Sequence, residues 1–190
     1  MKSFRLFVVF ALCLVLTLPA VSGAEETPLR KTLTIQLEGQ EEPYTVTLFR
    51  WEGILSLWYA ADHFAPVVTS GGLRFELIDN QLSAPVHFGV ESLYDPSGMQ
   101  AGSMDDVQAA YEQDGWVCEP LDATRMLPTF GQEPAEGLIA RKGGQVAQAI
   151  LTDVTSGTYV CTMQYPTEAA EGWGGRMAQM LNTLQALPGE

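Results

Sequence analysis

The segment TYVCTMQYPTEAAEGWGGRMAQMLNTLQAL, residues 158–187, decides the fold that the sequence predicts. Its first part, residues 158–165, is a strand candidate, because alternate residues of a strand point to the same face of a sheet. The predicted apolar face consists of Tyr159, Cys161, Met163 and Tyr165. Pro166 has no N–H to donate to a neighbouring strand, so we expect the strand to end there.

The second part of this segment predicts an amphipathic C-terminal helix. Thr167 is the expected N-cap, with Glu168 and Glu171 near the positive end of the helix dipole. Apolar residues then recur at helical spacing and form one stripe, which consists of Trp173, Met177, Met180, Leu181 and Leu184. Such a helix has to bury its stripe, and we expect it to pack on the strands that precede it.

The rest of the chain reads mostly as strands. Alternating apolar and polar residues predict strands at 31–37, 44–51, 54–59, 73–78, 86–90, 116–123, 136–142 and 145–154. The first two would form a hairpin, and Gly143-Gly144 is a strong signal for another. Residues 66–72 read as a loop. Ser103 followed by two acidic residues predicts the start of a second helix, which Gly115 would end.

The N-terminus predicts export. Lys2 and Arg5 form a positive region, residues 6–18 are apolar, and small residues precede a cleavage site between Gly23 and Ala24. This is the pattern of a secretory signal peptide, and the apolar run is short for a membrane span. We therefore expect a secreted or extracytoplasmic bacterial protein, with residues 24–30 as a flexible lead-in and residues 31–190 as one domain.

Removal of residues 1–23 makes an acidic chain more acidic. The full chain has a net charge of −13, and cleavage removes two of the ten basic residues and none of the 23 acidic ones, which leaves −15. Such a chain repels phosphate backbones and anionic lipid head groups. We therefore expect neither nucleic acid nor an anionic membrane surface as a partner. The acidity by itself needs no function, because it keeps an exported protein in solution.

The two cysteines that remain after cleavage are Cys118 and Cys161. Export would permit a disulfide between them. Both, however, lie in apolar strand-like segments where a buried free thiol is also normal. The sequence leaves these two alternatives open.

The search for reactive groups finds little. His63 and His87 are not spaced as metal ligands, and no zinc, calcium, nucleotide-binding or serine-nucleophile pattern occurs. We therefore predict no catalytic residue, no metal and no cofactor. Aromatic residues allow a platform for sugars or peptides, although core packing is their usual role: these are Trp51, Trp58, Tyr59, Phe64 and Trp116.

Gly172, Trp173 and Gly174, followed by another glycine, form an unusual group, because each glycine inside a helix costs about 1 kcal/mol relative to alanine. The structural explanation is that small residues let Trp173 pack closely on the sheet, or that the helix begins near Arg176. The functional explanation is that these residues form a flexible partner surface. We favour the structural explanation.

The C-terminal half resembles the Mog1/PsbP-like family. The hairpin at Gly143-Gly144 and the turn at Ser156-Gly157 lead into Tyr-Val-Cys-Thr-Met-Gln-Tyr-Pro at 159–166, then Glu-Ala-Ala-Glu at 168–171 and a helix that includes Met-Leu-Asn-Thr-Leu at 180–184. Residues 54–64 are similar to an early element of that family, with Ala60 where a proline is common. The resemblance implies an α/β/α sandwich and binding to proteins without catalysis.

These observations predict an α+β fold, in which helices, among them the C-terminal amphipathic helix, cover an antiparallel sheet. The expected function is a non-catalytic protein-binding or accessory module that acts through a sheet edge, a loop or the Trp173 region. Two other functions stay open. A small hydrolase of envelope or carbohydrate substrates would need a cleft with converging acid and base groups. A small-ligand carrier would need an apolar cavity between sheet and helix.

Overall fold

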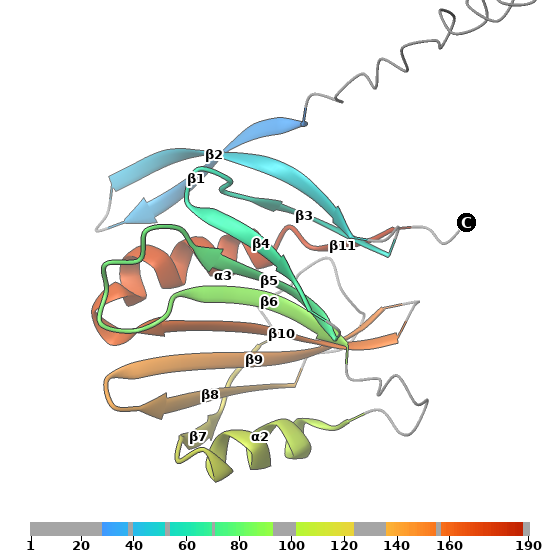
Figure 1. The fold of residues 1–190 in the computed structure, drawn as a ribbon, viewed down its shortest axis with the longest axis vertical. Coiled ribbons are helices and arrows are strands. Elements are labelled where there is room, and N and C mark those ends of the chain that lie inside the picture. The colour runs from blue at the N-terminus through green and yellow to red at the C-terminus, as the bar shows by residue number, and fades with distance from the viewer. Residues whose placement is uncertain are drawn as a thin grey trace, which may run out of the picture.

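The computed structural model describes residues 28–37, 40–51, 54–69, 71–92, 102–123, 136–154 and 157–187. The strands form two antiparallel sheets, with the orders β1-β2-β3-β11 and β4-β5-β6-β10-β9-β8-β7 (Figure 1). The strands are β1 Arg30–Leu37, β2 Gln40–Trp51, β3 Leu55–Tyr59, β4 Phe64–Val68, β5 Gly72–Leu77, β6 His87–Ser92, β7 Val117–Pro120, β8 Gly137–Lys142, β9 Gln145–Val154, β10 Gly157–Pro166 and β11 Gln185–Ala186.

The predicted α/β/α sandwich, in which helices cover one sheet, is wrong. The N-terminal hairpin does not join the larger sheet. It pairs with β3 and β11 to form a second sheet instead. The α-helices in the described part of the chain are α2 Met104–Gln113 and α3 Gly175–Leu181. Of these, α3 contacts β1 and β3 of the smaller sheet and β6 and β10 of the larger one, so it lies between the two sheets. The fold is therefore β-rich.

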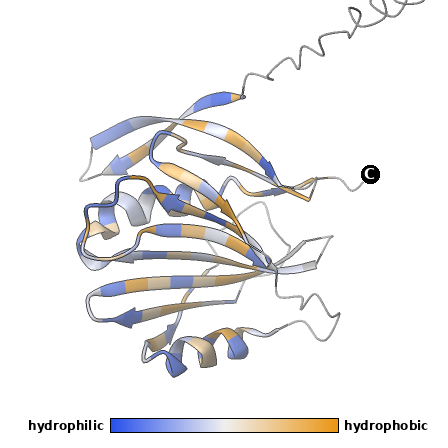
Figure 2. Ribbon diagram, viewed as in Figure 1, coloured by the Kyte–Doolittle hydropathy of each residue, from blue (hydrophilic) through white to orange (hydrophobic). Residues whose placement is uncertain are grey.

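The main core fills the space between the sheets around α3. The helix contributes Met177, Met180 and Leu181, which are fully buried. Beside the helix the two sheets meet directly: Phe75 of β5 packs edge-on against Phe49 of β2, with ring centroids 5.5 Å apart. This core buries the apolar residues that alternate with polar ones along the strands (Figure 2).

A second, smaller core lies on the opposite face of the seven-stranded sheet, which we call the outer face. Here α2 packs against the sheet, and the buried residues are Trp116, Leu138, Ala140, Ala147, Ala149 and Val160. Strand β10 serves both cores, because Cys161 and Met163 belong to the main core and Val160 to the smaller one. The predicted alternation along β10 is thus confirmed.

Several local predictions are confirmed. The hairpin of β1 and β2 forms as expected, and β8 and β9 are joined at Gly143 and Gly144, which have φ angles of 54° and 79°. The start of α2 is a capping box: Ser103 Oγ accepts from the N–H of Asp106, and Asp106 Oδ2 accepts from the N–H of Ser103 at 2.8 Å. Gly115, with a φ of 83°, follows the end of this helix.

Other local predictions are wrong. Residues 64–68 form edge strand β4, although a loop was predicted from residue 66; a proline is compatible with an edge strand when its missing N–H faces away from the partner. Thr167 does not cap a helix, because its hydroxyl donates to the carbonyl of Gly144. The C-terminal helix also starts irregularly, as a 3-10 turn at Thr167–Ala169 and a π-helical turn at Ala170–Gly174, before α3.

The glycines in this irregular start differ in the space beside them. A Cβ atom at Gly174 would lie 3.0 Å from the Tyr165 ring, whereas a Cβ at Gly172 would meet only Arg176, at 3.7 Å. Gly174 therefore lets the helix approach β10 closely. The regular helix begins one residue later, at Gly175.

The two glycines provide a matched test of this close approach. Gly172→Ala and Gly174→Ala gain the same helix propensity, but only Gly174→Ala crowds Tyr165. Overpacking of this kind typically costs about 1–3 kcal/mol. We therefore expect Gly174→Ala to have a free energy of unfolding lower than that of Gly172→Ala by about that amount in urea denaturation. Equal stabilities would contradict the close approach as the reason for Gly174.

Candidate functional site

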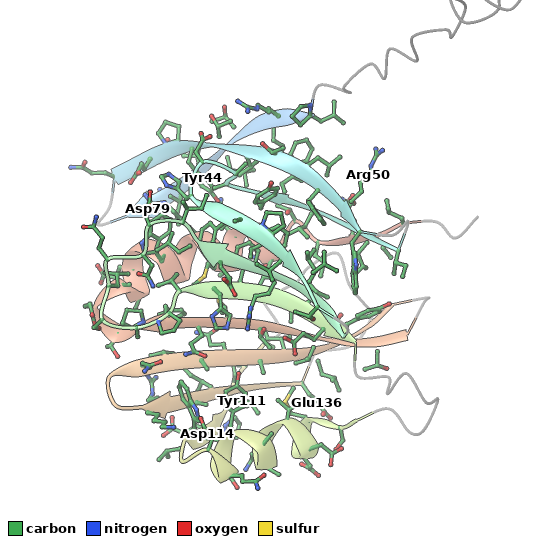
Figure 3. The ribbon with its side chains drawn as sticks, in the orientation of Figure 1. Tyr44, Arg50, Asp79, Tyr111, Asp114 and Glu136 are labelled. Atoms are coloured by element: carbon green, nitrogen blue, oxygen red, sulfur yellow. The ribbon has the colours of Figure 1, made fainter. Side chains whose placement is uncertain are left out.

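Two hollows that are open to solvent lie on the outer face of the seven-stranded sheet, lined by residues of the described part of the chain. The first has a volume of about 500 Å³ and lies beside the C-terminal end of α2, where Tyr111 and Asp114 are found (Figure 3). The second has a volume of about 580 Å³ and lies over β5 and β6, where Arg74, Glu76 and His87 line it. Pro85 lines both hollows. We call the two together the sheet-face groove.

The register of the strands shows how the floor of the groove is built. Glu76 of β5 lies opposite His87 of β6, and His87 lies opposite Gln164 of β10. Gln164 in turn lies opposite Ala147 of β9, a residue of the smaller core. Residues paired directly across antiparallel strands point to the same face, so this row of polar side chains lies on the outer face, next to the part that α2 covers.

One wall of the groove lies at the C-terminal end of α2, where hydrogen bonds to Asp114 fix its side chains. Asp114 Oδ2 accepts from Trp116 Nε1 at 3.0 Å and from Lys142 Nζ at 3.1 Å. The hydrogen bond from Lys142, then that from Trp116, holds the pKa of Asp114 below its usual value. Tyr111 packs edge-on against Trp116 at 5.6 Å, and burial raises the pKa of its phenol to about 12. At neutral pH this wall therefore presents an ionised, paired carboxylate and a protonated hydroxyl.

The floor near this wall carries a pair of amides. Gln164 Nε2 donates to Gln145 Oε1 at 2.9 Å. Among the described residues, the Gln145 amide nitrogen and the Gln164 carbonyl have no protein partner. A partly buried polar group gains free energy by pairing. These groups can therefore take one acceptor and one donor from a ligand.

The second hollow holds another paired charge. Arg74 Nη2 bonds Glu76 Oε1 at 2.8 Å, while Arg74 Nε is buried and has no partner in the described part of the chain. Burial, and then the Arg74 charge, lower the pKa of His87, so this side chain is neutral at pH 7. The rim is fixed by Asn80, whose side chain accepts from the N–H of Leu82 and donates to the carbonyl of Ala84.

Both edges of the seven-stranded sheet carry a proline that faces outward. Ile78 donates its N–H to His63, so in β4 residues 63, 65 and 67 pair with β5, and Pro66 lies at a position that faces the open side. Leu121 donates to Gly137, so Pro120 lies at the corresponding position of β7. An added strand would find no donor there. Each edge of the larger sheet therefore offers an added strand one donor fewer.

The Trp173 region has a structural role. The Trp173 ring packs edge-on against Phe64 at 5.5 Å and His63 at 5.3 Å, and the Arg176 guanidinium lies 5.3 Å from its centre. Arg176 also bonds Glu42, which ties this cluster to the N-terminal hairpin. These contacts hold the start of the helix against β4. Of the three predicted surface residues, Gly172 has the most open space beside it, and Gly174 has none.

The two cysteines are both free thiols and lie on opposite faces of the seven-stranded sheet. Cys161 of β10 belongs to the main core, and Cys118 of β7 packs against the smaller core, with β8 and β9 between their strands. Three strand intervals of about 4.8 Å place them far beyond the 7 Å Cα separation that a disulfide tolerates. The structure therefore answers the open question in favour of free thiols.

Sequence reasoning assigned no role to the groove residues. Arg74, Glu76, Gln145 and Gln164 were read only as the polar positions of strands, and His87 as an ordinary strand residue. Their alternation showed that they share the polar faces of their strands. Which strands would lie side by side, however, depended on the sheet order, which the sequence did not reveal.

Comparisons with known proteins add no family: neither a scan against protein-family models nor a search of curated proteins finds a match. Within the described ranges no group of three or more His, Cys, Asp or Glu side chains could hold a metal ion. The same residues contain no helix that is long and apolar enough to cross a membrane. The predicted signal peptide, residues 1–23, lies outside the described residues.

The depressed pKa of His87 predicts an acid-sensitive stability. The unfolded chain takes up this proton near pH 6.5, before the folded chain does, so the stabilisation is present above pH 6.5 and is lost as the pH falls below it. Between pH 7 and pH 5, we expect the free energy of unfolding to fall less for His87→Asn than for the parent chain. In an NMR titration, Arg74→Gln should raise the pKa of His87. A His87 pKa at or above 6.5 in the parent chain would contradict this description.

The free thiols predict the outcome of alkylation. A chain that starts at Ala24 and is denatured without reductant should take up two iodoacetamide groups, measured by intact mass. Under native conditions Cys161 should stay unmodified, because it is fully buried and burial raises its pKa to about 12. A mass two daltons below that of the chain with two free thiols, with no iodoacetamide adduct, would instead indicate a disulfide.

Proposed function

We propose that this chain is an exported, non-catalytic binding or accessory module that recognises a protein partner through the sheet-face groove. The observation that carries the proposal is the pair of amides of Gln145 and Gln164, which keeps one donor and one acceptor without a partner among the described residues and lies between the ion pairs Arg74–Glu76 and Lys142–Asp114. The hydrogen bond between the two amides fixes their side chains, so little conformational entropy is lost when a ligand pairs with them.

The charge state of the groove favours binding over hydrolysis. A glycoside hydrolase needs one carboxylic acid whose pKa is raised, so that it can protonate the leaving group. The pKa of Asp114 is lowered instead, and the Glu76 carboxylate bonds Arg74. These groups are suited to fixing the walls of a surface rather than to transferring protons.

The packing also favours a surface over an internal ligand. An apolar carrier needs an apolar cavity between sheet and helix. In this chain, buried side chains of both sheets and α3 occupy that region as one core. Both hollows described above are open and lined by polar as well as apolar groups.

A photo-crosslinking experiment tests this proposal. p-Benzoylphenylalanine would replace Ser83, an exposed residue that lines the second hollow, in cells that make the protein. The control position is Gln185, which is exposed on β11 of the other sheet. We expect a discrete protein adduct through position 83 that position 185 does not give. The double variant Gln145→Glu/Gln164→Glu should reduce the adduct at least tenfold. The same products from both positions, or products that the double variant leaves unchanged, would refute the proposal.

A further inference from the structure

We propose that the ligand of the sheet-face groove is an extended, uncharged polar peptide segment whose main chain is held by Gln145 and Gln164. This inference rests on the proposed function and names the chemistry of the partner. A peptide unit offers one N–H and one C=O. The free carbonyl of Gln164 and the free amide nitrogen of Gln145 match that pair, one acceptor and one donor.

The length of the segment follows from the strand order. The two hollows of the groove meet at Pro85 and together extend from Arg74 on β5 to Lys142 at the end of β8, with β6, β10 and β9 between them. Four strand intervals of about 4.8 Å span roughly 19 Å. An extended chain advances about 3.3 Å per residue, so about six residues cross the groove.

The charges of the groove select an uncharged segment. Its cations and the carboxylates beside them already form the pairs Arg74–Glu76 and Lys142–Asp114. A Lys or Arg of the ligand would have to compete with these cations for their carboxylates. An Asp or Glu of the ligand would be repelled by the acidic chain, whose net charge after cleavage is −15. A segment of Gly, Ser, Thr, Asn and Gln avoids both costs.

The aromatic residues of the groove favour a peptide over a sugar. Sugars stack on exposed aromatic faces, but only 8% of Trp116 is exposed. Its ring is contacted by Tyr111 at 5.6 Å, and Lys142 Nζ lies 5.9 Å from its centre. The groove therefore binds mainly through hydrogen bonds rather than through stacking on aromatic rings.

An NMR experiment tests this inference on the chain from Ala24 to Glu190. The first probe is a pool of capped hexapeptides built from Gly, Ser, Thr, Asn and Gln. The second and third are the same pool with Lys or Glu at positions two and five, and the fourth is chitotetraose. The readout is the side-chain amide signals of Gln145 and Gln164. We expect the uncharged pool to shift both signals, and the charged pools to bind at least tenfold more weakly.

Two variants of matched charge complete the design. Gln145→Glu removes the amide nitrogen that would donate to the ligand carbonyl and should weaken binding of the uncharged pool at least tenfold. Gln185→Glu makes the same change outside the groove and should leave binding unchanged. A response to chitotetraose alone, equal binding of a charged pool, or no response to any pool would overturn the peptide inference. In each of these cases, a groove-dependent crosslink from position 83 would still support the proposed function. If that crosslink is also absent, both the proposed function and the peptide inference are refuted.

Discussion

The whole structure depends on strand β10 having two apolar faces of unequal size. Cys161 and Met163 point into the large core, and Val160, between them in the sequence, points into the small one. Because successive residues of a strand alternate, a shift of one residue in its pairing would exchange the two faces and expose both cores. The pairing of β10 with β6 and β9 therefore fixes at once where α3, α2 and the smaller sheet can pack.

The helix α3 shows why this arrangement needs two sheets. Its apolar residues contact strands on both sides, from β1 and β3 to β6 and β10. Met177, Met180 and Leu181 are fully buried between these strands, whereas Ala178 and Gln179 stay partly exposed. The predicted sandwich had only a helix on this face of the larger sheet. In the structure the smaller sheet covers that helix, so the three layers are the larger sheet, α3 and the smaller sheet (Figure 1).

Much of the fold could be predicted from short-range patterns. Period-two alternation located most strands, and the glycine pair and the Ser103 capping box were recognisable because each depends on residues close in sequence. The division of the strands into two sheets was not predictable in the same way. It depends on which edges meet, such as β6 with β10, which lie more than 60 residues apart. The candidate site shares this limit, since Glu76, His87 and Gln164 become neighbours only through that pairing.

Pro66 and Pro120 have a consequence for the behaviour of the protein at high concentration. The open edges of a sheet are the usual templates on which strands of other molecules add, and repeated addition leads to fibrils. Here each edge of the larger sheet lacks one outward N–H, so a strand that adds would leave a carbonyl oxygen without a donor. These two residues therefore make both edges of the larger sheet poorer templates for strand addition. A missing N–H does not depend on charge, so salt should not change this property of the edges.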